Sequence, residues 1–446
     1  MNEKTITEFL SNEYKEFAMY VIEGRALASC IDGFKPVNRK IIHTANLLWK
    51  SGNEKPLKIF QLAGKVASDC FYHHSDTSLG SAIVNMAQKF KNNAPLLEEI
   101  GQFGSLRSPQ AGAARYISTK LTENFRLIYK DFELLKYKIE EGEPIEPEYF
   151  LPIIPTILLN GSSGIAVGFA SNILNRDIKS IIDATQKVLN NKKITDIKPS
   201  LIGFTGDYIQ DTTNNKKWYI RGKYTKVNTT TIRITELPPS ITYEKYEEYL
   251  DKLVDDKVIV SYDDNCKDNI DYTLKFARAE LEKMDNDQLI KLLKLEETST
   301  EIFSTLDENG KLKIFENTID IIKYFVDFRL KYYDIRKQHL LDKMNKELKL
   351  LSNKGKFIKA IIDKKIVINN IPKTKIIESI ETLKLDKIDN SYDYLLRLPI
   401  YSLTKELYDK LKEDYKNKKE EIVIIKATDP KDMYLTDLAE LKKKYK

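Results

Sequence analysis

Apolar residues recur at helical spacing near the N-terminus of the chain. Phe9, Leu10, Tyr14, Phe17 and Val21 follow one another mostly at steps of three or four residues. Such spacing gathers the apolar side chains on one face of a helix. The pattern therefore predicts an amphipathic helical arm over residues 1–24.

Two further helices are predicted over residues 56–70 and 76–88, with a short polar turn between them at residues 71–75. Two helices across so short a turn are typical of a helix-turn-helix, whose second helix can enter the major groove of DNA. A helical hairpin that binds nothing gives the same pattern. The sequence thus favours a helical domain here and leaves its ligand open.

The middle of the chain changes to short apolar runs interrupted by glycine and proline. Residues 131–150 are acidic and carry two prolines, which indicates a connector, and residues 151–170 indicate short strands around a glycine-serine run. From about residue 175 to 318 the pattern is that of mixed helices and strands. The elements predicted there are paired strands at 218–225 and 230–237 and helices at 243–253 and 285–293.

Helical periodicity returns in the C-terminal third. Residues 319–351 predict one long helix, and a further helix is expected from about Ser402. The apolar residues that step by three or four along them are Leu340, Met344, Leu348 and Leu351 in the first and Leu403, Leu407, Leu411 and Tyr415 in the second. Long helices beside a compact helical segment suggest a coiled-coil arm with a docking head. An ordinary helical domain is the alternative.

The composition describes a soluble globular protein. At 446 residues the chain is long enough for about two to four domains. Its 42% hydrophobic and 31% charged residues fit neither a disordered nor a membrane protein, and no apolar run is long enough to span a bilayer. The first ten residues lack the pattern of a secretory signal. Three widely separated cysteines favour a reducing compartment.

Positive charge is concentrated between Arg25 and Phe125. This segment holds thirteen Lys/Arg against seven Asp/Glu, an excess of six that equals the net charge of the whole chain. Such a field favours a polyanionic partner, with nucleic acid as the first candidate. A lysine-rich solvated surface is the alternative.

Within this segment, Arg115 stands directly before Tyr116. Tyrosine is a poor nucleophile at its free pKa of about 10, so attack on a phosphodiester needs a neighbouring cation and usually a metal ion. An arginine fork matches phosphate oxygens. The pair is therefore a candidate phosphodiester-cleaving site, although most of the 25 tyrosines must be packing or surface residues.

Other cations lie at the starts of predicted helices. Lys35, Arg39 and Lys40 surround a glycine- and proline-controlled turn that leads into a helix, where they could grip a phosphate backbone. His73 and His74 precede the predicted helix 76–88, and a helix N-terminus favours an anion. A zinc site is rejected, because the sequence nearby has no ligand set at zinc spacing.

Two glycine-rich segments complete the pattern. Residues 100–105 form a glycine-bounded turn before Tyr116. Residues 160–168 resemble a phosphate-binding loop but lack its Gly-Lys-Ser/Thr ending, so they are not a P-loop. Ile165, at the tip of this glycine-serine hairpin, could act as an apolar wedge between base pairs. A buried loop isoleucine is the alternative.

The order of these segments resembles the breakage-reunion subunit of type IIA DNA topoisomerases over essentially the whole chain. The matching segments are DGFKPVNRK, YHHSD, IVNMAQ, IGQFGS, AARY, LPIIPTILLNGSSGIAVG and LLRLPIYSLTKEL. The hairpin looks like that of the bacterial gyrase and topoisomerase IV A subunits, whereas YHHSD and IGQFGS look like the eukaryotic enzyme. That mixture, with the chain length, resembles the T-even phage members of the family.

The resemblance implies roles for individual residues. Tyr116 would attack a DNA phosphodiester and become a 5′-phosphotyrosine, and Arg115 would stabilise the pentacoordinate transition state. The DNA contacts that the resemblance implies are Arg39, His73 and His74 on the scissile strand, Lys35, Lys40 and Lys65 nearby, and Ile165 as the intercalating residue. Ser75 departs from the family, which usually has glycine there, and this bears on the local backbone geometry.

The fold implied is a multidomain α+β one. Its parts are an N-terminal helical arm (1–24), a winged-helix, CAP-like breakage-reunion domain (25–150), an α/β tower domain (151–320), and a coiled coil with a helical C-gate (321–446). The chain would act on double-stranded DNA as a homodimer, since two Tyr116 residues must cut opposite strands.

No residues of this chain are expected to bind metal, and Asp263 and Asp264 are interpreted as surface residues. Mg²⁺ and ATP would be held by one or more partner subunits, onto which the N-terminal arm would dock. With no room for a DNA-wrapping domain after Lys446, the expected activity is relaxation and decatenation without negative supercoiling. The expected location is the cytoplasm of a host bacterium, away from membranes.

Two alternatives remain. A non-catalytic winged-helix DNA-binding or architectural protein would share the basic segment and a salt-dependent affinity for DNA, but it would form no covalent adduct. The other is a gyrase or topoisomerase IV protein of the A type, truncated at its C-terminus, and the HHSD and QFGS segments speak against it.

Overall fold

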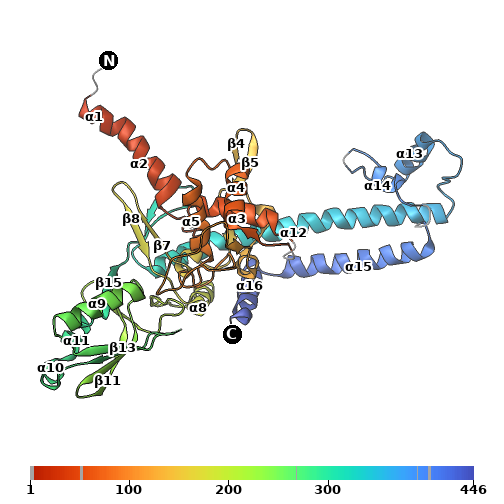
Figure 1. The fold of residues 1–446 in the computed structure, drawn as a ribbon. Coiled ribbons are helices and arrows are strands. Elements are labelled where there is room, and N and C mark those ends of the chain that lie inside the picture. The colour runs from red at the N-terminus through yellow and green to blue at the C-terminus, as the bar shows by residue number, and fades with distance from the viewer. Residues whose placement is uncertain (1–4, 51–53, 268, 389, 400–402, 446) are drawn as a thin grey trace. The chain divides into compact units, whose positions relative to one another are not determined.

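The computed structural model describes residues 5–50, 54–267, 269–388, 390–399 and 403–445. The chain divides into two compact units, one formed by residues 1–329 with 437–446 and the other by residues 330–436. Figure 1 labels the elements along the chain. Within the described residues, no helix is both long enough and apolar enough to cross a bilayer.

The helices of the first unit are α1 (Ile6–Phe9), α2 (Lys15–Val21), α3 (Pro36–Leu48), α4 (Ile59–Asp69), α5 (Asp76–Ala87), α6 (Glu123–Ile128), α7 (Thr156–Leu159), α8 (Ile178–Leu189), α9 (Tyr243–Asp255), α10 (Arg278–Lys283) and α11 (Asn286–Leu292). Its strands are β1 (Leu57–Lys58), β2 (Ser118–Thr119), β3 (Tyr129–Lys130), β4 (Tyr137–Glu140), β5 (Glu143–Pro147), β6 (Leu151–Pro152), β7 (Ser162–Ile165), β8 (Ala170–Ile173), β9 (Asp207–Gln210), β10 (Lys217–Arg221), β11 (Lys223–Asn228), β12 (Thr231–Glu236), β13 (Ser261–Asp264), β14 (Tyr272–Lys275), β15 (Glu296–Thr300), β16 (Ser304–Leu306) and β17 (Leu312–Ile314).

The described part of the N-terminal arm is helical, as expected. A capping box between Thr5 and Glu8 begins α1, and π-helical turns at Leu10–Tyr14 and Ile22–Ala26 join and end the two α-helices. Apolar side chains of the arm, among them Phe9 and Phe17, are exposed. The arm therefore carries an apolar surface that this unit does not bury.

Helices α3, α4 and α5 pack together around buried aliphatic residues. Pro36 occupies the first position of α3. A proline has no N–H, but at this position the N–H would have no partner within the helix, so no helical hydrogen bond is lost. Ile42, Val66 and Ile83, one from each helix, are fully buried. Helix α4 begins at Ile59, later than predicted, because the two residues before it pair as strand β1 with β2. The predicted pair of helices across a short turn is confirmed.

One prediction for residues 131–170 is wrong, and another holds in part. The stretch interpreted as a connector forms a hairpin, in which β4 and β5 pair antiparallel across the tight turn at residues 141–142. Both turn residues have positive φ, the backbone conformation that suits two-residue hairpins. The short strands expected around the glycine-serine run are present as β6, β7 and β8, but Pro155 precedes a helical turn, α7, between them.

Two antiparallel sheets follow, with strand orders β15-β10-β9 and β11-β12-β14-β13. Residues 218–225, predicted as one strand, are split between these sheets at Gly222. A Cβ there would lie 2.2 Å from the carbonyl oxygen of Glu236, so only glycine fits this crossing. The predicted pairing with residues 230–237 holds for β11, which pairs with β12. Asp263 and Asp264 lie in strand β13, not in a loop, and both are exposed.

The four-stranded sheet and the helices that cover it share one apolar core. Leu250 of α9 and Leu289 of α11 are buried in it with Ile234 of β12 and Leu274 of β14. A capping box between Asp285 and Gln288 begins α11 close to the predicted boundary. The three-stranded sheet has a smaller apolar cluster around Trp218 and Ile220.

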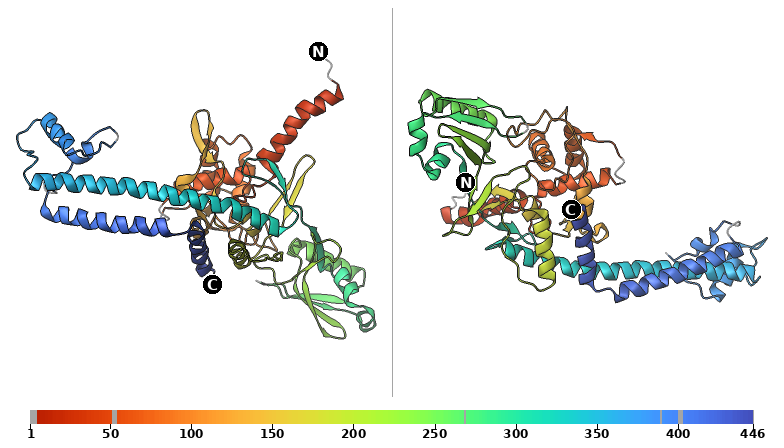
Figure 2. Two further views of the ribbon diagram at one scale, coloured as in Figure 1. Left: turned by 180° about the vertical axis from the view of Figure 1, so that it is seen from behind. Right: turned by 90° about the horizontal axis from the view of Figure 1, so that it is seen from below.

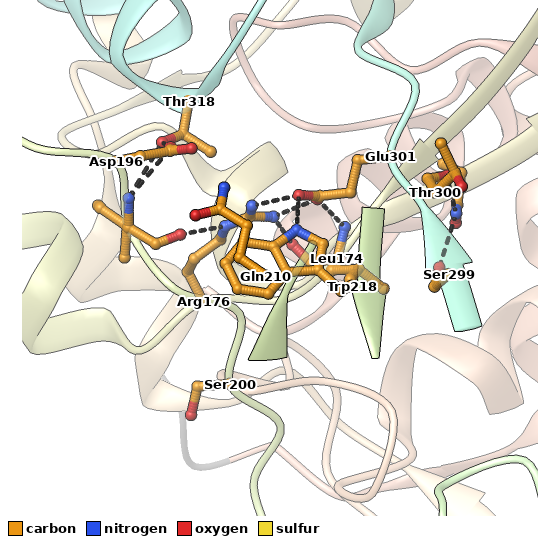
Figure 3. Close-up of polar contacts among 12 residues, drawn as sticks. Leu174, Arg176, Asp196, Ser200, Gln210, Trp218, Ser299, Thr300, Glu301 and Thr318 are labelled. Atoms are coloured by element: carbon orange, nitrogen blue, oxygen red, sulfur yellow. Dashed lines mark hydrogen bonds and ion pairs between the residues drawn. The ribbon is translucent and has the colours of Figure 1, made fainter. Parts of the chain in front are cut away.

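A buried ion pair joins the three-stranded sheet to the segment after β8. Arg176 Nη1 and Nη2 donate to the two carboxylate oxygens of Glu301 at 2.6 and 2.7 Å, and Trp218 Nε1 of β10 donates to the same carboxylate at 3.0 Å. Figure 3 shows the Glu301 carboxylate joined by dashed lines to both of these side chains. Arg176 also donates to the carbonyl oxygens of Leu174 and Ile197.

The second unit is helical. It contains the C-terminal part of α12 (Thr318–Ile362), α13 (Lys373–Thr382), α14 (Asp393–Leu396), α15 (Lys405–Ala427) and the beginning of α16 (Pro430–Lys444). Ser402, where the second long helix was expected to begin, lies outside the described residues, and Thr404 caps α15. Figure 2 shows α15 alongside α12 in both views. An ion pair between Lys418 and Glu347 at 3.1 Å links them.

We expect Glu301→Ala to lower the free energy of unfolding by about 3–5 kcal/mol, because it leaves the fully buried guanidinium of Arg176 without its carboxylate. Arg233→Ala, which removes the exposed ion pair with Asp271, should cost less than about 1 kcal/mol. Denaturant unfolding of both variants, followed by circular dichroism, measures the difference. An equal decrease in the free energy of unfolding in the two variants would contradict this expectation.

Candidate active site

Tyr116 and Arg115 lie together on an exposed turn at residues 114–116. The Tyr116 side chain is 68% exposed, and the guanidinium carbon of Arg115 lies 5.0 Å from the centroid of its ring. The arginine fork is therefore next to the tyrosine, as the sequence predicts. A phosphate group approaching the phenol would also meet a fixed positive charge.

The backbone of this turn is fixed to the start of α4. Strand β2, just after the turn, pairs with β1, and Ile59 N donates to the carbonyl oxygen of Ile117 at 3.1 Å. Lys58 Nζ donates to the carbonyl oxygen of Tyr116 itself at 2.8 Å. The tyrosine side chain is thus exposed while its backbone is held by the helix-turn-helix. Sequence reasoning missed Lys58, since nothing in its neighbourhood signals a long-range contact.

His73 and His74 lie in the turn between α4 and α5. His73 Nε2 is 3.2 Å from Glu140 Oε1 of the β4–β5 hairpin, and His74 Nε2 is 3.3 Å from the Tyr20 hydroxyl of α2. Both side chains are exposed. The turn is thus in contact with the β4–β5 hairpin and with α2, two contacts that the sequence did not predict.

Ser75 adopts an ordinary backbone conformation with φ −58°, and its Oγ accepts a hydrogen bond from Thr77 N at 3.2 Å. It is therefore the N-cap of α5, a position that serine suits well. Serine at this position brings no backbone strain. The neighbouring Phe71 instead carries the positive φ of this turn.

Lys35 and Lys40 each contact another segment of the first unit. Lys35 Nζ donates to the carbonyl oxygen of Ser163 in β7 at 2.7 Å, and burial lowers the pKa of its ammonium group. Lys40 Nζ donates to Cys70 O at 2.5 Å and to Glu146 Oε2 at 2.8 Å. Lys65 lies on the exposed face of α4.

Arg39 is placed differently from the expectation of a direct phosphate contact. Its side chain is buried, and its Nε and Nη2 donate to the Asp32 carboxylate at 2.8 and 3.1 Å. In this structure the guanidinium holds the turn before α3 and does not face solvent. The sequence does not indicate the Arg39–Asp32 contact, because the two residues are seven apart and side-chain pairs on a helix form at spacings of three or four.

Four of the predicted cations line one pocket of about 370 Å³, namely Lys35, Lys40, His73 and His74. Tyr20, Arg25 and Glu140 also line it. Arg115 and Tyr116 do not belong to its lining. The structure therefore brings the basic and histidine positions together, and it places the arginine-tyrosine pair on a separate turn of the same helical domain.

Ile165 ends strand β7, which pairs with β8 in register from Ser162–Ile173 to Ile165–Ala170. Its side chain is 89% exposed. The alternative of a buried loop isoleucine is therefore wrong. An exposed apolar side chain at the tip of a hairpin has the geometry that an inserting wedge requires.

The family resemblance implies a magnesium ion, which oxygen ligands hold. Among the described residues, no three His, Cys, Asp or Glu side chains come together in a way that could hold a metal ion.

Comparisons with known proteins identify the family of this chain. Residues 25–442 match the family of the DNA gyrase/topoisomerase IV A subunits. The DNA topoisomerase medium subunit of Enterobacteria phage T4 is 34% identical over 448 residues, covering 99% of this chain and 100% of the phage protein. DNA topoisomerase 2 of Plasmodium falciparum is 35% identical over 478 residues, covering 97% of this chain and 34% of the parasite protein. This chain therefore spans about a third of that longer relative.

A solved structure, the DNA-binding, cleavage and re-ligation domain of Plasmodium falciparum topoisomerase II, matches with a TM-score of 0.87 and 33% identity. The match covers 98% of this chain and 64% of that one. The expected α+β fold and the resemblance to type IIA topoisomerases, phage members included, are thereby confirmed. The chain belongs to the family of the DNA gyrase/topoisomerase IV A subunits.

Proposed function

We propose that this chain is the DNA-cleaving subunit of an ATP-dependent type II DNA topoisomerase. It makes a transient double-strand break, lets a second duplex pass and reseals the break. The observation that carries the proposal is the exposed Arg115–Tyr116 pair, whose backbone is fixed to α4. The full-length match to the phage T4 medium subunit supports it.

In the cleavage step, the Tyr116 hydroxyl oxygen bonds to phosphorus and the bond from phosphorus to the 3′ oxygen breaks. The phenol loses its proton, and the departing 3′ oxygen gains one. The 5′ end stays attached as phosphotyrosine, so the reverse reaction reseals the strand without another energy source. Arg115 stabilises the additional negative charge of the pentacoordinate phosphate, which is worth most where water is excluded.

The surrounding residues bind the duplex. Lys35, Lys40, Lys65, His73 and His74 contact phosphates, and Ile165 inserts between base pairs. Arg39 contributes indirectly through Asp32, by shaping the turn that carries Lys35 and leads into α3, where Lys40 lies. Partial unstacking costs a few kcal/mol per step and is offset by wider contact with the bent DNA.

The domains follow from the same proposal. Residues 25–150 form a winged-helix domain, residues 151–320 a tower domain, and residues 321–446 a coiled-coil arm with a dimerising C-gate. Two copies act together, each cutting one strand. Mg²⁺ and ATP are bound by partner subunits that dock on the N-terminal arm, and the complex works in the cytoplasm of a bacterial host. The name of the phage relative, a medium subunit, supports a division of functions among chains.

The non-catalytic alternative is not favoured. A protein that only bends or coats DNA has no use for an arginine beside an exposed tyrosine, yet this chain keeps both. It also matches the topoisomerase cleavage domain over nearly its whole length.

We expect Tyr116→Phe to abolish covalent attachment to DNA, because phenylalanine has no nucleophilic oxygen. Arg115→Ala should reduce the rate by about 10²–10³-fold, the typical effect of losing one transition-state donor. The assay mixes the chain with its partner subunit, magnesium and plasmid, adds denaturing detergent and detects protein on the 5′ ends of breaks. Tyr137→Phe, which changes another exposed tyrosine, should retain the adduct. An adduct in Tyr116→Phe would refute the assignment.

Lys65→Ala should weaken DNA binding and reduce the slope of log affinity against log salt by about 0.9, the value for one lost phosphate contact. Fluorescence anisotropy with a labelled duplex at several salt concentrations measures the slope. Lys412→Ala, on the exposed face of α15, is the control and should leave the slope unchanged. An unchanged slope in Lys65→Ala would remove this residue from the interface.

The reconstituted complex should relax and decatenate plasmid DNA without introducing negative supercoils. Gel electrophoresis of relaxed and of catenated substrates, with and without ATP, tests this. ATP-dependent appearance of negatively supercoiled product from a relaxed plasmid would contradict the expectation.

A further inference from the structure

Strand β7 of the β7–β8 hairpin lies directly against the chain that leads into α3. Lys35 Nζ donates to the carbonyl oxygen of Ser163. Gly164 approaches so closely that a Cβ there would lie 2.1 Å from the carbonyl oxygen of Ala26. Strand β7 is therefore held at its backbone by the domain that carries the predicted DNA contacts.

The other strand of the hairpin is held by the three-stranded sheet. Asn172 N and the carbonyl oxygen of Asn172 exchange hydrogen bonds of 2.9 Å with Ile302. The Asn172 side-chain amide donates to the carbonyl oxygen of Thr300 at 2.8 Å and to Ser299 Oγ at 3.0 Å. Ser299 and Thr300 end strand β15, so Asn172 attaches β8 to that sheet.

A buried carboxylate strengthens the same junction. Glu301 Oε1 accepts from Leu174 N, just beyond β8, at 2.9 Å. The same carboxylate is paired with Arg176 and accepts from Trp218 of β10 (Figure 3). One charged group therefore bonds to the end of β8 and to the sheet, in a site that solvent does not reach.

These contacts extend along β7 as far as Gly164, whereas the side chain of the next residue, Ile165, is almost fully exposed. A side chain that must separate stacked bases needs support against the force that the duplex returns. The two strands receive that support from different places, β7 from the segment around α3 and β8 from the sheet β15-β10-β9.

We propose that Asn172 is a positioning residue that, with the Arg176–Glu301 pair, makes the hairpin and the sheet β15-β10-β9 move as one body. Insertion of Ile165 and bending of the duplex then occur together, because the sheet cannot shift without carrying the hairpin. The inference rests on the proposed function and adds residues that touch neither DNA nor the reacting phosphate.

The test uses the full chain, its partner subunit, and a duplex that carries a donor and an acceptor dye at its two ends. Asn172→Ala and Asn172→Asp remove the amide donors and leave the buried ion pair intact. Asn190→Ala is the matched control, because Asn190 Nδ2 also donates to a backbone oxygen, that of Gln186 at 3.0 Å, but at the end of α8. Ile165→Ala removes the wedge itself.

We expect the ratio of bent to unbent bound DNA to fall about threefold to tenfold in both Asn172 variants, the factor that corresponds to one net hydrogen bond. Energy transfer between the dyes reports this ratio. Overall affinity for DNA should be unchanged for Asn190→Ala. For the Asn172 variants it should fall by no more than the bent-to-unbent ratio does, since the unbent complex keeps its phosphate contacts.

The outcomes separate the two proposals. If wild type bends DNA and Ile165→Ala does not, but the Asn172 variants bend as wild type does, the positioning role is refuted and the proposed function stands. If Asn190→Ala loses bending as strongly as Asn172→Ala, the effect is one of general stability and the positioning role is again refuted. If wild type binds DNA without bending it, both this inference and the proposed role of the hairpin fail.

Discussion

The structure of the candidate site depends on one buried carboxylate, that of Asp32. It accepts hydrogen bonds from Arg39 Nε and Nη2 and from the backbone N–H groups of Phe34 and Phe150. The Asp32 carbonyl oxygen in turn accepts from the side-chain hydroxyls of Tyr129 and Thr156. A charge without solvent contact is tolerated only when its oxygens are satisfied in this way. The turn before α3, strand β3 and helix α7 are thereby joined at one point.

The contacts of Asp32 determine the positions of Lys35 and Lys40. The turn held by Asp32 leads directly into Lys35, whose ammonium group reaches the hairpin at Ser163. One turn of α3 later, Lys40 reaches Glu146 of β5 and the carbonyl oxygen of Cys70 at the end of α4. The surface proposed to bind DNA is thus positioned by a buried carboxylate, that of Asp32.

Sequence patterns predicted the elements that form by local rules. The helices α4, α5, α9 and α12 lie close to their predicted positions, because their apolar residues have a clear helical period. The β4–β5 hairpin was missed because its two prolines suggested a connector, although both lie in β5, an edge strand of a two-stranded sheet that tolerates them. The split at Gly222 depends on the approach of Glu236, a contact that no local pattern contains. The same holds for Arg39, whose partner Asp32 is not a neighbour in any local pattern. Tyr116 and Ile165 are both exposed, as the roles expected for them require.

The glycine at position 164 has a consequence for how this sequence can change over time. Its φ is not of the kind that only glycine adopts, so the constraint is one of space alone: any side chain would collide with the backbone of Ala26. No substitution of Ala26 relieves that collision, because the atom in the way is a carbonyl oxygen that every amino acid carries. Replacement of Gly164 by any other residue therefore requires a larger distance between the hairpin and the segment before α3. In related proteins, a glycine at this position would therefore go with the same close spacing of the two segments.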